Sequence, residues 1–385
     1  MALKSGLAAQ AGFVTETTVG VAKTPTLFLP LVDESIELEK ERLESEAIFA
    51  GRRVLDSDQW NGGPNTVGGD VSLELTNRGL GVLFKHAFGG VSTTGSGPYT
   101  HTFTPGDLSG VSLTAQIGVP SVSGTVQPKT ASGCKIASWD LGFASDEIAT
   151  WAATLVGQHL QIGSRSVADG VTTNADATVT SATAVFSQAD QGKFISGTGI
   201  PTGAYILTVT NATTIEMSAN ATADGTGVAI VIGLALATAT LPADIKPLKF
   251  NHGYITVGGA EVKVKSGNIS GDNGLADDRR FIGSQDIAEP LEADLRTYEG
   301  ELVLEFTDLT QWNRYVAGDE FDIVLAFTME TGSVTITAHA RYDGGTPSVG
   351  GREIVEQSLP FKVIGDGSDA DAITVVLVNS DSSAA

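Results

Sequence analysis

A nine-residue stretch, Gly69–Asn77 with the sequence GDVSLELTN, decides the fold because a version of it occurs twice in the chain. It aligns without gaps on Gly300–Asp308, GELVLEFTD, and the Gly, Leu, Glu and Thr at four positions are identical. Apolar and polar residues alternate in both stretches, which is the pattern of a half-buried strand. Because internal repeats determine the architecture of a chain, this pair predicts a duplicated structural unit.

Each stretch leads directly into an expected amphipathic helix. In the first, Leu80–Phe88, apolar residues recur at helical spacing and Gly89 supplies the stop. In the second, Leu309–Val316, the spacing is weaker, Asp308 can cap the start and Gly318 follows the end.

Further features recur in the same order around the two stretches. Arg52-Arg53 precedes the first stretch and Arg279-Arg280 precedes the second at a similar distance. Apolar strands are expected downstream of both, at 111–119 and 321–329. The shared order favours duplication; the alternative is chance similarity between two β-rich regions.

The rest of the chain is also rich in strand signals. Thr, Val, Ile and Gly are abundant, and Gly258-Gly259 between two alternating runs predicts a hairpin turn. The region 164–233 has few charges and is dominated by Ala, Thr, Val and Gly. This composition predicts a small inserted all-β module. The predicted organisation is an N-terminal arm (1–30), a first repeated unit (31–163), the insert (164–233) and a second repeated unit (234–385). The predicted fold class is mainly β, with two antiparallel sandwich or barrel units that each carry one flanking helix.

Charge and cysteine content exclude several classes of protein. The formal net charge is −22, which argues against gripping duplex DNA or RNA, because such proteins need a cationic surface. The single cysteine, Cys134, excludes an intramolecular disulfide and a Cys-rich zinc site and is expected to be a small core residue. No apolar run is long enough for a membrane helix, and residues 1–13 do not fit a secretory signal.

A search for catalytic patterns finds none that is complete. The five histidines are scattered, and His86, off the apolar stripe of its helix, is expected to be a solvated or edge residue. Asp56, Asp58 and Asn61 resemble part of a calcium loop, but the closing acid is missing. We therefore predict no enzyme, no cofactor and no metal site.

The ordered pattern resembles the major tail tube proteins of long-tailed, siphovirus-like bacteriophages. In the first half it comprises the strand Ile36–Lys40, the polar loop 52–64, the stretch 69–75 with its helix, and Thr100–Gly106. In the second half it comprises Tyr254–Val257 and the strand–helix unit 300–315. The resemblance covers nearly everything outside 164–233, and it lies in the series rather than in any single motif.

This resemblance implies a structural virion protein. Sheets of neighbouring subunits would join into a barrel around a lumen, and stacked rings would form a tail tube, the conduit for genome DNA ejection. The duplication favours three chains per ring, with pseudo-sixfold symmetry, over six. The implied partners are further copies of the chain and the tail tip, tape measure and tail terminator proteins, with assembly in the host cytoplasm, no membrane, and the insert on the tube exterior.

Acidic lumen walls would oppose the phosphates and let DNA pass without specific binding. The candidates for lumen-facing acids are Glu37, Glu39, Asp70, Glu74, Glu301 and Glu305; the alternative for each is outside solvent. The candidates for contacts between rings are Arg52, Arg53, Asp56, Asp58, Trp60, Arg279 and Arg280, together with the arm 1–30.

A second function remains open. An immunoglobulin-like or adhesin-type surface protein that recognises a host cell or a glycan would also be all-β and could carry the Thr-rich insert. The two helices and the lack of a secretion signal fit that reading poorly.

Overall fold

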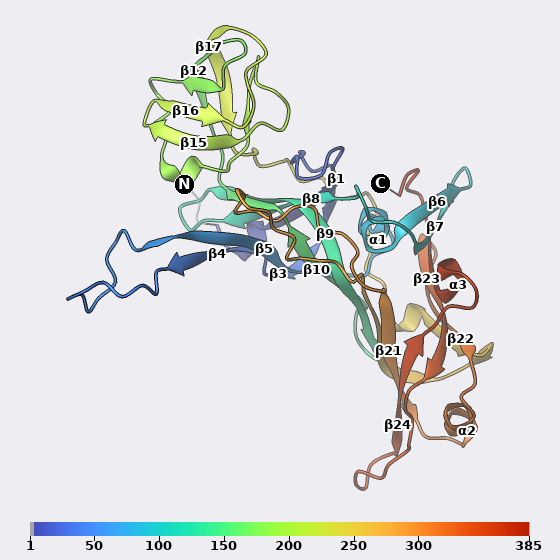
Figure 1. Ribbon diagram of the computed structural model, residues 1–385. Helices are drawn as coiled ribbons and strands as arrows, with labels where there is room; N and C mark the ends of the chain where they lie inside the picture. The colour runs from blue at the N-terminus through green and yellow to red at the C-terminus, as the bar shows by residue number, and fades with distance from the viewer. Residues whose placement is uncertain (1–3, 385) are drawn as a thin grey trace.

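The structure, a computed structural model, describes residues 4–384 and consists mainly of antiparallel strands (Figure 1). The predicted mainly-β fold class is confirmed. The first three residues of the predicted arm and the last residue of the second unit, Ala385, lie outside the described residues. Short 3-10 turns occur at Gly6–Ala8, Gln188–Asp190 and Phe250–His252.

The first half of the chain forms two connected sheets. The outer sheet has the order β2 (Leu27–Leu29), β1 (Gln10–Thr15), β8 (Leu113–Pro120), β9 (Val126–Ala144) and β11 (His159–Ile162). In the inner sheet, β3 (Leu31–Glu34) and β4 (Glu37–Glu44) both pair with β5 (Trp60–Glu74), which is followed by β10 (Thr150–Gly157) and the end of β9. The long strand β9 therefore belongs to both sheets.

The second half repeats this order of pairing. Its outer sheet contains β18 (Gly253–Val257), β22 (Phe321–Met329), β23 (Gly332–Tyr342) and β25 (Ile373–Asn379). Its inner sheet contains β20 (Val264–Asp272), β21 (Thr297–Glu305), β24 (Glu356–Val363) and the end of β23. The strands that carry the repeated stretches, β5 and β21, occupy the same place, as duplication requires.

The two halves also differ in their additions. The hairpin of β6 (Gly89–Thr94) and β7 (Tyr99–Pro105) occurs in the first half, and the short α3 (Asp369–Ala372) occurs in the second. The two-residue strand β19 (Ala260–Glu261) pairs with β18 across Gly258-Gly259, where both glycines have positive φ (58° and 78°), so the expected hairpin turn is present.

The inner sheets of the two halves are joined edge to edge. Residues 138–144 of β9 pair with residues 266–272 of β20, which gives one sheet in the order β4–β5–β10–β9–β20–β21–β24, called the joined sheet below. Across the join, the Asn268 amide donates to an Asp140 carboxylate oxygen at 2.7 Å. On the other layer, β7 pairs with β25 and links the halves a second time.

Helix α1 (Gly81–Phe88) is buried in the core beside this join. Phe84 packs edge-on against Trp151 with ring centroids 6.0 Å apart, and Phe88 stacks on Tyr298 of the second half at 6.2 Å. Gly89, with φ +87°, ends the helix as expected. The expectation that His86 is solvated is wrong, because the helix is covered on both sides and His86 meets Thr15 of β1 at 3.0 Å.

Helix α2 (Thr310–Ala317) has a different environment. The Thr310 amide donates to the Asp308 carboxylate at 2.7 Å, and Gly318 ends the helix with φ +69°. Every residue of α2 is at least partly exposed. Leu309, just before the helix, is 54% exposed, whereas its counterpart Leu80 is fully buried.

Residues 165–232 form a separate sheet in the order β14–β17–β12–β13–β16–β15. The strands are β12 (Arg165–Thr172), β13 (Thr178–Thr180), β14 (Ile195–Ser196), β15 (Ile206–Asn211), β16 (Thr214–Met217) and β17 (Gly225–Ile232). This part has its own hydrophobic cluster around Ile206, Ile215 and Ile230, and it lies on the side of the molecule away from the hollow of the joined sheet (Figure 1).

The N-terminal residues are more ordered than the predicted arm. Residues 10–15 form β1, whose Ala11 and Phe13 are buried between β2 and β8. This part of the predicted arm therefore supplies core side chains to the outer sheet.

Candidate functional site

The strand register places all six predicted acids on one face of the joined sheet. Residues directly opposite each other in an antiparallel pair point to the same side. Glu37 lies opposite Gly68, Asp70 opposite Thr154, and Glu74 opposite Thr150. Glu39 follows Glu37 with strand period two and therefore shares its side.

The same face continues across the join into the second half. Thr154 lies opposite Ser138, which lies opposite Asp272 of β20. Beyond it, Asn268 lies opposite Glu301, and Glu305 follows with the same parity on β21. Contacts on this face include Thr154 donating to Asp70 at 2.7 Å and Ser358 donating to Glu301.

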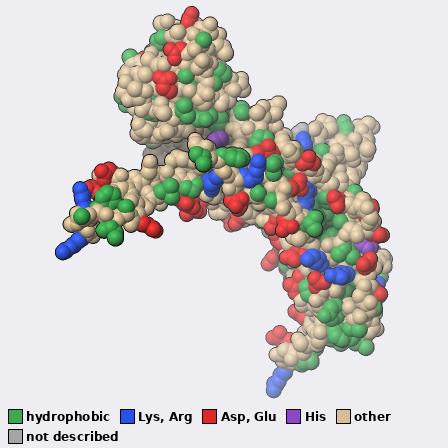
Figure 2. Space-filling model, in the orientation of Figure 1, with side chains coloured by type: hydrophobic (Ala, Val, Ile, Leu, Met, Phe, Trp, Pro, Cys, Tyr) green, Lys and Arg blue, Asp and Glu red, His purple; other side chains and the backbone are tan. Residues whose placement is uncertain are grey.

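We call this face the concave face, since it lines the inside of the bend between the two halves, opposite α1 (Figures 1 and 2). Figure 2 shows acidic side chains along this inner side. The acids on it are Glu37, Glu39, Asp70, Glu74, Asp140, Asp272, Glu299, Glu301, Glu305 and Glu356. Lys362, opposite Glu299, and Lys265, paired with Glu305 and Glu356, lie among these acids, and the acids outnumber them.

Lys265 is already neutralised by acids of the same face. Its ammonium lies 2.8 Å from Glu356 and 3.2 Å from Glu305, and these hydrogen bonds raise the pKa of Lys265. A phosphate near this part of the sheet would therefore meet a cation that has its partners within the chain.

The sequence prediction missed Asp140, Asp272, Glu299 and Glu356. Glu299 was detectable, because it continues the alternation of Glu301 and Glu305 along β21. Asp140 alternates with buried Trp139 and Leu141, but its place beside the second half follows only from the β9–β20 pairing.

The predicted contact residues Arg52, Arg53, Asp56, Asp58 and Trp60 lie at the end of the hairpin of β4 and β5, which extends past the edge of the sheet (Figure 1). Arg52 pairs with Asp56, and the Arg42 guanidinium lies 5.0 Å from the centre of the Trp60 ring. The tip carries exposed apolar side chains, including Ile48 at 99% and Val54 at 83% exposure. Large exposed apolar residues of this kind are typical of an interaction surface.

Arg279 and Arg280 lie in the corresponding loop of the second half, 273–296, which folds back onto the first half. Arg280 donates to the Asn65 carbonyl oxygen at 2.6 Å and to the Thr66 hydroxyl at 2.9 Å. Arg279 donates to the Glu289 carbonyl oxygen within the loop. Both arginines therefore hold the loop inside one chain, whereas the Arg52 side chain stays 56% exposed at the hairpin tip despite its pair with Asp56.

A buried ion pair anchors the same loop. Lys135 of β9, 1% exposed, donates to Glu289 at 2.6 Å and to the Leu108 carbonyl oxygen at 2.6 Å. Burial alone would raise the pKa of Glu289, but the hydrogen bonds from Lys135 and the Gly110 amide lower it overall. The pair therefore holds the loop of the second half against the first half in its charged form.

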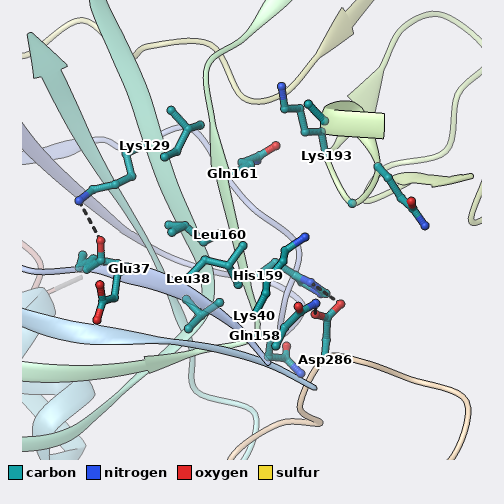
Figure 3. A pocket seen from close by; sticks show the side chains of 17 residues that line it. Glu37, Leu38, Lys40, Lys129, Gln158, His159, Leu160, Gln161, Lys193 and Asp286 are labelled. Atoms are coloured by element: carbon teal, nitrogen blue, oxygen red, sulfur yellow. Dashed lines mark hydrogen bonds and ion pairs between the residues drawn. The ribbon is translucent and has the colours of Figure 1, made fainter. Parts of the chain in front are cut away.

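A cavity of about 640 Å³ lies between β4, β11 and residues 189–193 (Figure 3). At one end, His159 lies 3.3 Å from Asp286, which also accepts from Asn65 at 2.7 Å. Burial raises the pKa of Asp286, but these two hydrogen bonds lower it overall. The His159 ring also packs on Phe194 and Tyr205, so this histidine connects both halves with the 165–232 sheet.

Metal ligands and the single cysteine complete the description of the site. Within 4–384, no group of three or more His, Cys, Asp or Glu side chains could bind a metal ion. Cys134 is buried, and burial followed by the nearby Glu16 charge raises the pKa of its thiol. None of the helices in this part of the chain combines the length and apolar content of a membrane span.

Comparison with protein families decides the wider assignment. The model of the family described as phage tail tube protein matches residues 6–229 and, a second time, residues 207–363. The chain belongs to the phage tail tube protein family. The two matches are consistent with a duplicated tail tube unit, as the repeated strand order also indicates. No curated protein matches the chain.

Membership of the tail tube family gives the protein a structural role in the phage tail and implies self-assembly into a tube. The first family match runs through most of 165–232, so the family comparison does not separate this part as an insert.

Proposed function

We propose that three chains form a ring with pseudo-sixfold symmetry and that stacked rings form the tube through which genome DNA is ejected. The observation that carries the proposal is the join of two equivalent inner sheets within one chain. A head-to-tail join of this kind, repeated between chains, forms a ring when the successive rotations add up to a full turn. With two units per chain, a ring of six units needs three chains.

The concave face is proposed to line the lumen. Its excess of acids disfavours phosphate binding, so DNA slides past rather than being held. Joining the sheets also removes the free strand edges, which otherwise invite uncontrolled pairing.

Contacts between rings are assigned to the tip of the β4–β5 hairpin. The hairpin continues the strand direction beyond the end of the sheet, and its tip exposes Ile48, Phe49, Val54 and Leu55. Burial of these side chains on the next ring would stabilise stacking. Residues preceding β1 are a second candidate, while Arg279 and Arg280 are proposed to act within a chain.

The remaining assignments follow from the same role. The 164–233 module is proposed as an inserted domain on the tube exterior, and the tail is proposed to be siphovirus-like. The tail tip, tape measure and tail terminator proteins are the proposed partners, and assembly is proposed to take place in the host cytoplasm.

Electron microscopy of the purified full chain tests this function. We expect stacked rings with a central channel and threefold symmetry, with the 164–233 modules projecting outward. Solid particles without a channel under all assembly conditions would overturn the tube, and rings of six chains would overturn the stoichiometry.

A second candidate function concerns the 164–233 module alone. It has a core of its own and lies away from the concave face, so it is placed to meet a host surface or glycan while the rest forms the tube. Glycan-array binding that is lost when the module is removed would support this role.

A further inference from the structure

Strand β23 of the second half is shorter than β9, its counterpart in the first half. The aligned glycines Gly69 and Gly300 lie opposite Leu155 and Phe361, respectively. On their other sides, Leu155 lies opposite Ile136 and Phe361 lies opposite Tyr342, so Ile136 of β9 is equivalent to Tyr342 of β23. From these points to the next strand, both halves have 13 residues, 137–149 and 343–355. In the first half most of these residues continue β9, whereas in the second half they form a loop.

The difference follows from what each segment has beside it. Residues 138–144 pair with β20 on one side and β10 on the other. Residues 343–345 contact β24, since the Asp343 amide donates to the Pro360 carbonyl oxygen at 2.9 Å and the Gln357 amide donates to the Gly345 carbonyl oxygen at 2.5 Å. Among the described strands of one chain, none occupies the position that corresponds to β20. A strand without partners leaves its backbone groups unpaired, so the segment does not form one alone.

The counterpart of β20 in the first half is the edge formed by residues 33–39. On β5, Glu34 lies opposite Val71 and Glu37 lies opposite Gly68. At the equivalent positions of β21, Gly267 lies opposite Leu302 and Ser270 lies opposite Glu299. Ile36 and Ile269, at the same position of the two edges, are both buried. Among the described strands, this edge pairs with β5 and with no other.

We propose that residues 343–350 of one chain form a strand on the 33–39 edge of a second copy of the chain. This pairing repeats between chains the β9–β20 join that each chain makes internally, and it rests on the ring proposed above. Carrying over the β9–β20 register, with its irregularity at Thr154/Leu155, places Thr346 opposite Glu37 and Ser348 opposite Ser35.

The chemistry of the two segments is compatible with this pairing. The edge DESIELE (33–39) carries four acids, while the proposed strand DGGTPSVG (343–350) carries one, Asp343 at its start, and is uncharged over 344–350. Hydroxyls of the segment can donate to the edge carboxylates, as Thr154 donates to Asp70 at 2.7 Å. In this register Pro347 lies opposite Ile36 and supplies no N–H to the Ile36 carbonyl oxygen, which already accepts from the Lys129 ammonium at 2.9 Å.

The exposure of α2 supports the same interface independently. Helix α1 lies over the internal join, where Phe88 stacks on Tyr298 and Arg296 donates to the Phe88 carbonyl oxygen at 2.8 Å. Helix α2 occupies the equivalent place beside β23 and β24, but its apolar residues, such as Val316 at 64% exposure, have no such cover. A second chain paired at 343–350 would supply that cover.

Cysteine cross-linking of the full-length protein tests the pairing. Thr346→Cys with Glu37→Cys, and Ser348→Cys with Ser35→Cys, place thiols opposite each other across the interface, within disulfide range. After oxidation of assembled rings, we expect covalent trimers on a denaturing gel. Ser348→Cys with Thr154→Cys is the control, because Thr154 lies two strands inside the sheet. The native Cys134 is buried and does not interfere.

The results of this experiment distinguish failure of the 343–350 pairing from failure of the proposed tube function. Rings that assemble but give no cross-link with either pair overturn this interface and leave the tube intact. A wild-type chain that never forms rings overturns the proposed function and this inference together. Because the variants can impair assembly, hydrogen exchange of the wild-type protein gives a second measurement. Amides of 343–350 are expected to slow at least about tenfold on assembly; unchanged exchange in intact rings counts against the pairing.

Discussion

The Lys135 ammonium on β9 lies 2.6 Å from the Glu289 carboxylate, in a loop of the other half of the chain. Lys135 is almost completely buried, and its other partner is the Leu108 carbonyl oxygen. The two halves are therefore joined by a buried charge pair as well as by strand pairing.

Removing one partner of this pair should destabilise the protein. Glu289→Gln leaves the Lys135 charge without a counter-ion, and we expect a loss of roughly 2–4 kcal/mol in the free energy of unfolding. Denaturant unfolding followed by fluorescence of the buried Trp139 and Trp151 measures it. The double variant Lys135→Met/Glu289→Gln should recover much of the loss. Glu261→Gln, at the exposed Lys263 pair, is the control and should cost less than about 1 kcal/mol; equal losses at both sites would contradict the argument.

His86 should make stability depend on pH. Burial, followed by the charges of Lys85 and Lys135, lowers the pKa of His86 from 6.5 to about 3. Below pH 6.5 the unfolded chain therefore takes up a proton that the folded chain does not, so stability is lost as pH falls from 6.5 toward 3. At pH 5 the loss relative to pH 7.5 is about 2 kcal/mol.

The test compares wild type with His86→Gln, which keeps a polar group near Thr15, by urea unfolding at both pH values. Between pH 7.5 and pH 5, the free energy of unfolding should fall by about 2 kcal/mol less in the variant than in wild type. Identical pH slopes would show that His86 does not keep its neutral form in the fold.

Reversing charge on the concave face should make assembled tubes bind DNA. Glu74→Lys/Glu299→Lys places two cations on different strands of this face. Because phosphate contacts dominate DNA affinity, we expect binding that is at least tenfold tighter at low salt and weakens steeply as salt rises. Glu330→Lys, in the β22–β23 turn outside the joined sheet, is the control. DNA binding that is unchanged by the double variant would remove this face from the lumen.

Removing the 165–232 sheet should leave assembly intact. Its first and last strands pair directly, with Arg165 opposite Ile232, so a short linker can replace the module without moving the flanking residues. We expect rings of unchanged symmetry by electron microscopy. Complete loss of rings, in a shortened chain that remains folded by circular dichroism, would show that these residues belong to the tube unit.

Equivalent leucines before the two helices should respond differently to charge. Leu80→Asp places a carboxylate in the core and should unfold the protein, because Leu80 is fully buried. Leu309→Asp should leave the single chain folded, with a melting temperature within a few degrees of wild type. It should nevertheless block ring formation in light scattering or microscopy, because α2 needs cover from a second chain. Normal assembly of Leu309→Asp would contradict that interface.

Local patterns were sufficient to predict much of the architecture. The alternation in 69–75 and 300–305 predicted β5 and β21, and the helical spacing of 80–88 predicted α1. The parity along a single strand also grouped Asp70 with Glu74, and Glu301 with Glu305. These predictions succeeded because strand and helix periods are properties of neighbouring residues.

Errors arose where burial depends on distant parts of the chain. His86 looked like a solvated residue because its helix is amphipathic by spacing, but β1 covers the polar side. Gln10–Thr15 looked like part of an arm because its apolar run is short, yet it lies between two strands that are distant in sequence.

The sequence by itself determined that the chain is a duplicated, acidic, mainly-β protein, because repeats, charge and periodicity depend only on the type and order of residues along the chain. Only the tertiary structure decided that β9 and β20 join the halves and that acids from six strands share one concave face. Those features depend on the register between distant strands, where a shift of one residue would turn every side chain to the opposite face.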